Sequence, residues 1–166
     1  MATDAHEIER RVLAAVRATE EPFEVIEIDP ELADTAAFCA HYGYAPQTSG
    51  NCILVASKDD PPVVAACLAL ATTKLDVNKR VRKLMGVRKA SFAPADLTRQ
   101  LTGMEIGGVT PFGLPDDLPL YLDARIAPID RLVVGGGSRS IKLVVTPAAL
   151  VAVGGIVVED LAVPLG

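Results

Sequence analysis

The spacing of apolar residues predicts several helices along the chain. Near the N-terminus, apolar residues recur every three or four positions, the period of one helix face, and Asp4 with Glu7 has the pattern of a capping box. Similar patterns recur later, each with a capping residue or proline at its start and most with a glycine at the end. The predicted helices span residues 4–18, 34–42, 76–86 and 94–103, with a short one beginning at Thr146.

Two of these helices have a predicted inward face. In the helix of residues 76–86, Asp76 is the expected N-cap, and the apolar positions fall on one stripe. Leu97 and Leu101 are expected to face the core from the helix of residues 94–103. The stripe of the first of these helices contains Val77, Val81, Leu84 and Met85.

Short apolar runs between the helices predict strands. The two longest, residues 52–56 and 63–70, are typical of buried strands joined by a tight connection. Residues 131–134 and 141–145 predict a hairpin around a glycine-rich turn. Further strands are predicted at residues 23–28, 90–93, 120–122 and 156–158, whereas residues 72–75 are expected to form a turn. Hairpins combined with helical connections predict a mixed sheet covered by helices, an α+β protein in which residues 1–166 form a single domain.

Composition narrows the class of protein. Half of the residues are hydrophobic and only 4% are aromatic, so the core must consist mainly of Val, Ile, Leu and Ala. The first residues begin acidic, and no apolar run approaches the roughly 20 residues of a membrane span, so we expect a cytoplasmic protein without a membrane partner. Cys39, Cys52 and Cys67 are widely spaced among apolar neighbours, which is typical of buried thiols. Neither a metal nor a cofactor is expected.

The charge distribution is uneven. The chain has a net charge of −5, yet residues 74–93 contain seven basic residues and one acidic residue, a local charge of +6 that leaves −11 for the rest. Such a basic segment is expected where a protein contacts a polyanion such as tRNA, but it is equally typical of a solvated helix face. The basic residues are Lys74, Lys79, Arg80, Arg82, Lys83, Arg88 and Lys89.

A glycine-rich segment, residues 102–113, contains four of the thirteen glycines and reads Thr-Gly-Met-Glu-Ile-Gly-Gly-Val-Thr-Pro-Phe-Gly. Glycine allows a ligand to approach the backbone closely, so the Gly107-Gly108 pair could present N–H groups to a carbonyl oxygen or a phosphate. The alternative is an ordinary long turn, because glycine and proline occur in most loops.

Other polar residues have two interpretations each. Asp123 follows a predicted strand, where a carboxylate either anchors a loop or contacts a ligand. Ser138 and Arg139 lie in the glycine-rich hairpin turn and are either ligand contacts or parts of an adaptable turn. The sequence contains no dinucleotide fingerprint, phosphate-loop motif or nucleophile-elbow motif.

Taken in order, these segments resemble the YbaK-like family, free-standing relatives of the editing domain of bacterial prolyl-tRNA synthetase. The resemblance covers roughly residues 25–162 and includes Lys-Leu-Asp-Val-Asn-Lys, Arg-Lys-Ala-Ser-Phe-Ala, the glycine-rich segment, and Leu-Asp followed by a Gly-Gly-Ser-Arg turn. It implies a single curved, barrel-like mixed sheet ringed by helices. It also implies hydrolysis of mischarged aminoacyl-tRNA in trans.

The resemblance also implies a set of site residues. Gly107, Gly108 and Asn51 would form the catalytic centre, with Asn51 at the position where relatives of the bacterial Cys-tRNA deacylases carry lysine. The basic residues of segment 74–93 would bind the tRNA acceptor end, and a synthetase is a further candidate partner. The implied substrate contacts are Thr110, Pro111, Asp123, Gly136, Ser138 and Arg139.

Two functions remain open at this stage. One is a trans-acting deacylase that holds the ester carbonyl against backbone donors and admits water, which needs no nucleophilic side chain. The other is a non-catalytic module that binds tRNA, an aminoacyl group or a synthetase. The sequence does not specify the amino acid, the tRNA or the oligomeric state.

Overall fold

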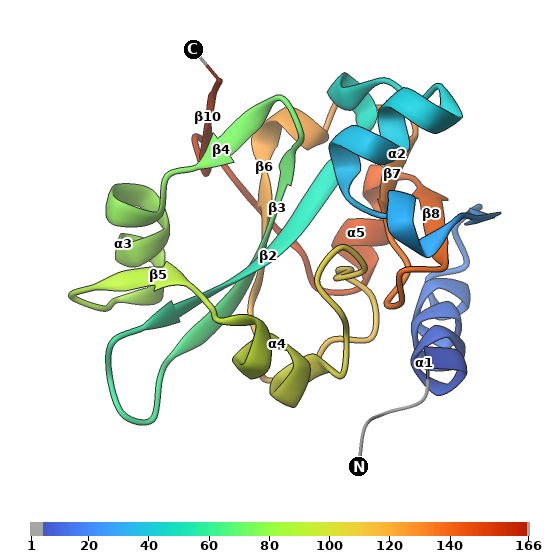
Figure 1. The fold of residues 1–166 in the computed structure, drawn as a ribbon. Coiled ribbons are helices and arrows are strands. Elements are labelled where there is room, and N and C mark those ends of the chain that lie inside the picture. The colour runs from blue at the N-terminus through green and yellow to red at the C-terminus, as the bar shows by residue number, and fades with distance from the viewer. Residues whose placement is uncertain (1–4, 166) are drawn as a thin grey trace.

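A computed structural model of the protein describes residues 5–165, and within this range the strands form three β-sheets flanked by helices (Figure 1). The α-helices are α1 (Ala5–Ala18), α2 (Thr35–Tyr42), α3 (Arg82–Met85), α4 (Ala95–Thr102) and α5 (Pro147–Ala152). Four helical segments of other types are η1 (Pro30–Leu32), η2 (Pro46–Thr48), η3 (Val77–Val81) and η4 (Ala124–Ile126).

The largest sheet has five strands in the order β5-β2-β3-β6-β9. Its two longest strands pair antiparallel, while β6 and β9 join in parallel, so the sheet is mixed as predicted. Both long strands are almost fully buried, which explains their continuous apolar sequence. The strands are β2 (Gly50–Ser57), β3 (Val64–Leu70), β5 (Ala90–Phe92), β6 (Leu120–Asp123) and β9 (Ile156–Val158).

The other two sheets are smaller. The predicted hairpin, β7 (Leu132–Gly135) and β8 (Ile141–Val145), forms with β1 (Glu24–Glu27) a sheet in the order β1-β8-β7. The third sheet pairs β4 (Thr73–Leu75) with β10 (Ala162–Pro164). A single bridge between Ser49 and Val133 links the start of β2 to β7. The mixed α+β class is therefore confirmed, but the expectation of a single barrel-like sheet is not, because the strands divide among three sheets.

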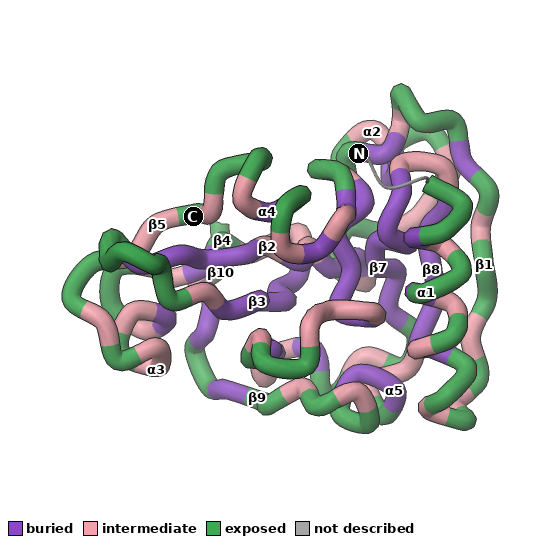
Figure 2. The backbone as a smooth tube through the Cα atoms, turned by 90° about the horizontal axis from the view of Figure 1, so that it is seen from below, coloured by how far each residue is buried: buried purple, intermediate pink, exposed green. Residues whose placement is uncertain are grey.

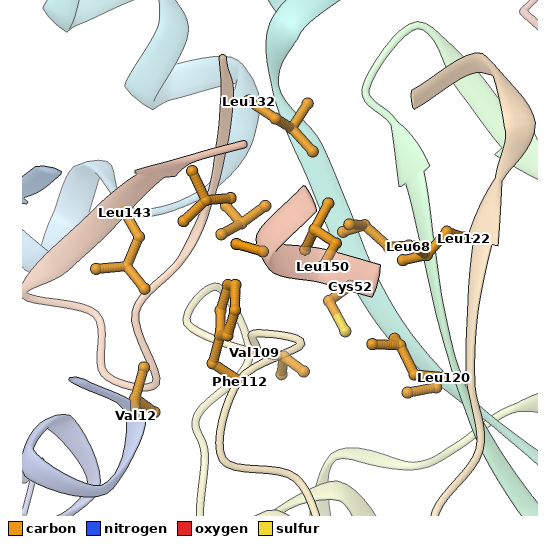
Figure 3. Close-up of a cluster of buried hydrophobic side chains, with 14 of the residues drawn as sticks. Val12, Cys52, Leu68, Val109, Phe112, Leu120, Leu122, Leu132, Leu143 and Leu150 are labelled. Carbon is orange, nitrogen blue, oxygen red and sulfur yellow. The ribbon is translucent and has the colours of Figure 1, made fainter. Parts of the chain in front are cut away.

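The main hydrophobic core lies between the five-stranded sheet and the hairpin. Aliphatic side chains from β2, β3 and β6 meet those of β7, β8 and α5, with Phe112 of the glycine-rich segment fully buried among them (Figure 3). The α1 helix covers one side through Ile8, Val12 and Val16. Figure 2 shows buried backbone along the central strands and exposed backbone on the outer turns of the helices. The glycine-rich segment is thus partly a core element.

Most of the predicted helices are present in the structure, but their type and buried faces differ in places from the prediction. Asp76 caps its helix by accepting a hydrogen bond from the Lys79 backbone N–H at 3.3 Å, but the first turns are a π-helix, η3, before α3 begins. In α4, Leu97 and Leu101 are only half-buried, whereas Thr98 and Thr102 are buried. The Thr102 hydroxyl donates to the Thr98 carbonyl and accepts from the Met104 N–H, so these buried polar groups are satisfied locally. The helix termini at Gly43, Gly86 and Gly103 are confirmed, each with a positive φ.

Two further differences involve residues outside the predicted strands. The expected turn at residues 72–75 contains β4, which pairs with β10, a strand that was not predicted. The predicted capping residue Asp4 lies outside the described residues. Among residues 5–165, no helix is both long and apolar enough to cross a membrane.

Candidate active site

A hollow of about 310 Å³ opens where β2, the start of α2, the glycine-rich segment and β8 meet. These elements are far apart in sequence and are brought together by the bridge from β2 to β7 and by the pairing of β7 with β8. We call this hollow the pocket. Its polar lining consists of Asp34, Thr35, Asn51, Cys52, Thr98 and Lys142, and backbone of Gly107 and Val109 also lines it.

Asn51 lines the pocket from the second residue of β2. The Thr35 hydroxyl, in the first turn of α2, donates a hydrogen bond to Asn51 Oδ1. This contact fixes the carboxamide oxygen and leaves the amide nitrogen without a hydrogen bond to any other described residue. Asn51 therefore has an amide donor that is available for a ligand in the pocket.

Lys142 is a buried cation that sequence reasoning did not single out. Its residue is 6% exposed, and its Nζ donates to the Gly107 carbonyl oxygen at 3.1 Å and lies 5.5 Å from the centroid of the Phe38 ring. Burial, together with the nearby Arg139 cation, lowers the pKa of the Lys142 amine to about 8. At neutral pH the pocket therefore contains an ammonium group that is largely shielded from solvent.

The glycine-rich segment is held against the hairpin by Arg139. Its guanidinium donates to the Pro30 carbonyl at 3.0 Å and to the Ile106 carbonyl at 2.7 Å, and it forms an ion pair with Asp34 at 3.3 Å. Gly107 has a φ of +91°, and a side chain there would collide with this guanidinium. Arg139 is therefore part of the scaffold that shapes the pocket.

Backbone donors in the glycine-rich segment differ in their availability. The N–H groups of Gly107 and Val109 have no hydrogen-bond acceptor among the described residues, and both residues line the pocket. The Gly108 N–H, in contrast, donates to the Glu105 carbonyl at 2.8 Å. Gly108 also lies against the Ser138 carbonyl so closely that a side chain has no room there. Its glycine is needed for packing, and it does not line the pocket.

The remaining implied substrate contacts do not line the pocket. Ser138 is buried and donates to Glu9 of α1 at 2.6 Å, and Gly136 packs against Ile141. Thr110 and Pro111 are buried, and Pro111 lines a separate hollow beside α1. Of the implied catalytic and substrate residues, only Asn51 and Gly107 are therefore brought together in the pocket.

Asp123 lies at the end of β6, away from the pocket. Its carboxylate is fully buried and accepts hydrogen bonds from Arg125 at 3.2 and 3.3 Å, and Arg125 in turn donates to the Ala162 carbonyl of β10 at 2.8 Å. This arrangement fits the anchoring alternative, since it ties two sheets together.

The basic segment forms a neighbouring surface on η3, α3 and the adjoining strands. Lys74 and Lys79 line a second hollow, which shares Phe92 of β5 with the pocket. Two of the arginines are partly used in structure: Arg80 donates to the Glu159 carbonyl, and Arg82 donates to the carbonyls of Asn78 and Val87. Exposed cations remain at Lys74, Lys79, Lys83, Arg88 and Lys89.

Comparisons with known proteins support one family. The model of the aminoacyl-tRNA editing domain matches residues 29–153. The uncharacterized protein YwhH of Bacillus subtilis (strain 168) is 36% identical over 87 residues, which make up 52% of this chain and 54% of YwhH. The match thus spans about half the length of that curated relative.

Solved structures show the same fold. A crystal structure of a candidate trans-editing enzyme for prolyl-tRNA synthetase matches with a TM-score of 0.78 and 23% identity, covering 96% of this chain and 98% of that one. A hypothetical protein matches with a TM-score of 0.81 and 24% identity, covering 92% and 99%. The resemblance to YbaK-like proteins is confirmed, and the chain belongs to the aminoacyl-tRNA editing domain family.

Proposed function

We propose that the protein hydrolyses the ester bond of mischarged aminoacyl-tRNA in trans, with the ester bound in the pocket between β2 and the glycine-rich segment. The observation that carries this proposal is the convergence of hydrogen-bond donors on one pocket. The Asn51 amide, the backbone N–H groups of Gly107 and Val109, and the Lys142 amine all border it. Hydrogen-bond donors with free N–H groups suit a substrate that presents carbonyl, hydroxyl and phosphate oxygens.

The pocket chemistry favours attack by water over attack by a side chain. Cys52 is the only thiol that lines the pocket among the described residues, and burial raises its pKa well above the ordinary range, so it stays a neutral thiol. His41 is exposed on α2 and contacts the Tyr42 ring instead of the pocket. Neither group is set up as a nucleophile.

In the proposed reaction, a water oxygen forms a bond to the ester carbonyl carbon. The bond from that carbon to the terminal ribose oxygen breaks, and the proton released by the water ends on the ribose oxygen. Negative charge develops on the carbonyl oxygen in between, and hydrogen-bond donors held in place stabilise it more than they stabilise the starting ester. Lys142 Nζ, Gly107 N–H and Val109 N–H are the proposed donors.

Lys142 has a second proposed role in the same site. Its bond to the Gly107 carbonyl ties β8 to the glycine-rich segment, so the charge that stabilises the transition state also fixes the loop. An ammonium group has three N–H donors, of which the Gly107 carbonyl uses one. The others remain for the substrate.

The test is a panel of tRNAs charged with non-cognate amino acids, incubated with the wild-type protein, Lys142→Met and Asn51→Ala. We expect wild type to release at least one amino acid, and both variants to be slower, Lys142→Met by about 10²-fold, the typical cost of losing one such donor. Thr48→Ala, on η2 outside the pocket, should match wild type. If wild type leaves every ester intact while still binding tRNA, the protein is a binding module and the proposal fails.

A further inference from the structure

Phe92 has an exposed aromatic ring beside the pocket. It is 57% exposed at the end of β5, an edge strand of the five-stranded sheet. Its backbone pairs with Val55 of β2, but its side chain belongs to none of the buried clusters among the described residues. An exposed aromatic ring has a flat apolar face on which a ligand can pack.

The position of Phe92 links two hollows. It lines the pocket together with Asn51, and it lines the second hollow together with Lys74 and Lys79. Among the described residues that border either hollow, it is the only aromatic one. A molecule that extends from the pocket into the second hollow can therefore contact this ring.

Two lysines and one aspartate, Asp76, line the second hollow together with the ring. Lys74 and Lys79 lie in the shared hollow, and Lys58 Nζ donates to the hydroxyl of Ser91, the residue before Phe92, at 3.0 Å. An aromatic side chain beside several lysines is the arrangement with which proteins bind single-stranded nucleic acid. The ring stacks on a base, and the ammonium groups meet the phosphates.

The chemistry of the proposed substrate indicates which part of the tRNA would lie in each hollow. The ester is attached to the terminal ribose of tRNA, and the terminal base is attached to the same ribose. When the ester lies in the pocket, that base must lie at the pocket rim, and the preceding phosphates must continue outward. Phe92 is the exposed pocket residue with a flat face for a base, and Lys74 and Lys79 line the second hollow, which shares this residue.

We propose that Phe92 is a stacking platform for the single-stranded 3′ end of tRNA, a proposal that rests on the proposed function. Phe92 borders both the ester pocket and the second hollow with its lysines. Stacking on a ring is tolerant of base identity, which suits an end whose sequence is common to all tRNAs. The terminal base would then hold the ester in register with Asn51 and the glycine-rich segment. The acceptor stem would continue over η3 and α3.

Binding of uncharged RNA tests this without any hydrolysis. The probe is an acceptor-stem RNA hairpin, with its single-stranded 3′ end either present or removed. The proteins are wild type, Phe92→Ala, Phe92→Tyr and the control Val157→Ala, an exposed apolar residue on the opposite edge strand β9. Thermal unfolding of each protein confirms that it is folded.

We expect wild type to bind the hairpin with the 3′ end roughly 5- to 150-fold more tightly than the truncated one. Phe92→Ala should lose this preference while binding the truncated hairpin as wild type does, and Phe92→Tyr and Val157→Ala should keep it. If Phe92→Ala retains the full preference, or weakens binding of both hairpins equally, the stacking proposal is wrong. The hairpins carry no ester, so this binding test does not depend on hydrolysis. The stacking proposal and the proposed hydrolysis can therefore fail separately.

Discussion

Lys142 shows how one buried side chain can affect both stability and chemistry. Burial lowers the pKa of its amine from 10.5 to about 8, so the unfolded chain binds this proton more tightly than the folded protein does. Below pH 8 the amine is charged in both states, and the buried charge lowers the free energy of unfolding by a constant amount. As the pH rises from 8 to 10.5, the folded state releases its proton first, and the penalty disappears.

Replacement of Lys142 by Met should therefore stabilise the protein at neutral pH. We expect the free energy of unfolding at pH 7 to rise by about 1–2 kcal/mol, since removing the desolvated charge outweighs the lost hydrogen bond to Gly107. At pH 10 the gain should shrink, because the wild-type penalty is then mostly relieved. Urea denaturation at the two pH values measures both effects.

The matched control is Lys83→Met, since Lys83 is exposed on α3. It should change the free energy of unfolding little at either pH, as expected of surface substitutions. A Lys142→Met variant that is less stable than wild type at pH 7 would contradict the account of Lys142 as a costly buried cation.

The contact between the glycine-rich segment and the hairpin is the element-level feature that forms the pocket. Arg139 of the hairpin turn binds Pro30 before α2 and Ile106 of the segment, so three parts of the chain meet at one guanidinium. The Gly108 carbonyl also accepts a hydrogen bond from the Gly137 N–H at 2.6 Å. A change in the hairpin turn should therefore loosen the glycine-rich segment.

Arg139→Lys keeps the charge but loses the planar fork that makes these contacts at once. We expect the free energy of unfolding of this variant to fall by about 1–2 kcal/mol, which lowers the Tm by several degrees for a protein of this size. Amide hydrogen exchange of residues 105–109 should become faster than that of β2. Arg99→Lys is the control, because Arg99 pairs with Asp96 on an exposed face of α4. Unchanged exchange of residues 105–109 would show that Arg139 does not hold the segment.

On the scale of the whole molecule, the basic surface of residues 74–93 adjoins the pocket. In Figure 1, α3, β4 and β5 lie at one side of the molecule and α1 lies at the other. The basic surface therefore borders the pocket through β5, while the remaining −11 of net charge is spread over the rest of the chain. This polarity would orient a polyanion with its end at the pocket.

Substitution of exposed lysines tests this orientation. We expect Lys74, Lys79 and Lys83, changed together to Ala, to weaken tRNA binding and to flatten its dependence on salt, by roughly 0.7–0.9 in slope for each lost phosphate contact. Arg80 and Arg82 are better left intact, because their guanidinium groups donate to backbone carbonyls and their loss would perturb η3 and α3. Titrations at several salt concentrations give the slope.

The control for this experiment changes Arg10 and Arg17 of α1 to Ala, because they are exposed cations on the other side of the molecule. Their substitution should leave the slope near that of wild type. If both sets of substitutions change the slope equally, the basic segment does not bind tRNA specifically and is better interpreted as a solvated helix face.

The sequence by itself determined most of the elements. Apolar periodicity predicted α1, and continuous apolar runs predicted β2 and β3, because burial of one face or both faces leaves a local pattern. Local start and stop signals predicted α2, α4 and α5, such as the Thr146 cap of α5. Glycine after each of three helices correctly marked their ends, since a positive φ is a local property. Motifs in the glycine-rich segment also carried the family resemblance.

Tertiary structure alone decided the site. Strands β4 and β10 are three residues long and gain their stability from each other across more than 80 positions of chain, so no local pattern indicates them. Gly108 and Ser138 look like ligand contacts in sequence, but their partners are each other and α1. Lys142 is the one polar residue in β8, and a lysine in a strand is most often solvent-exposed. Only the packing of β8 beneath the glycine-rich segment turns its side chain into the buried cation of the pocket.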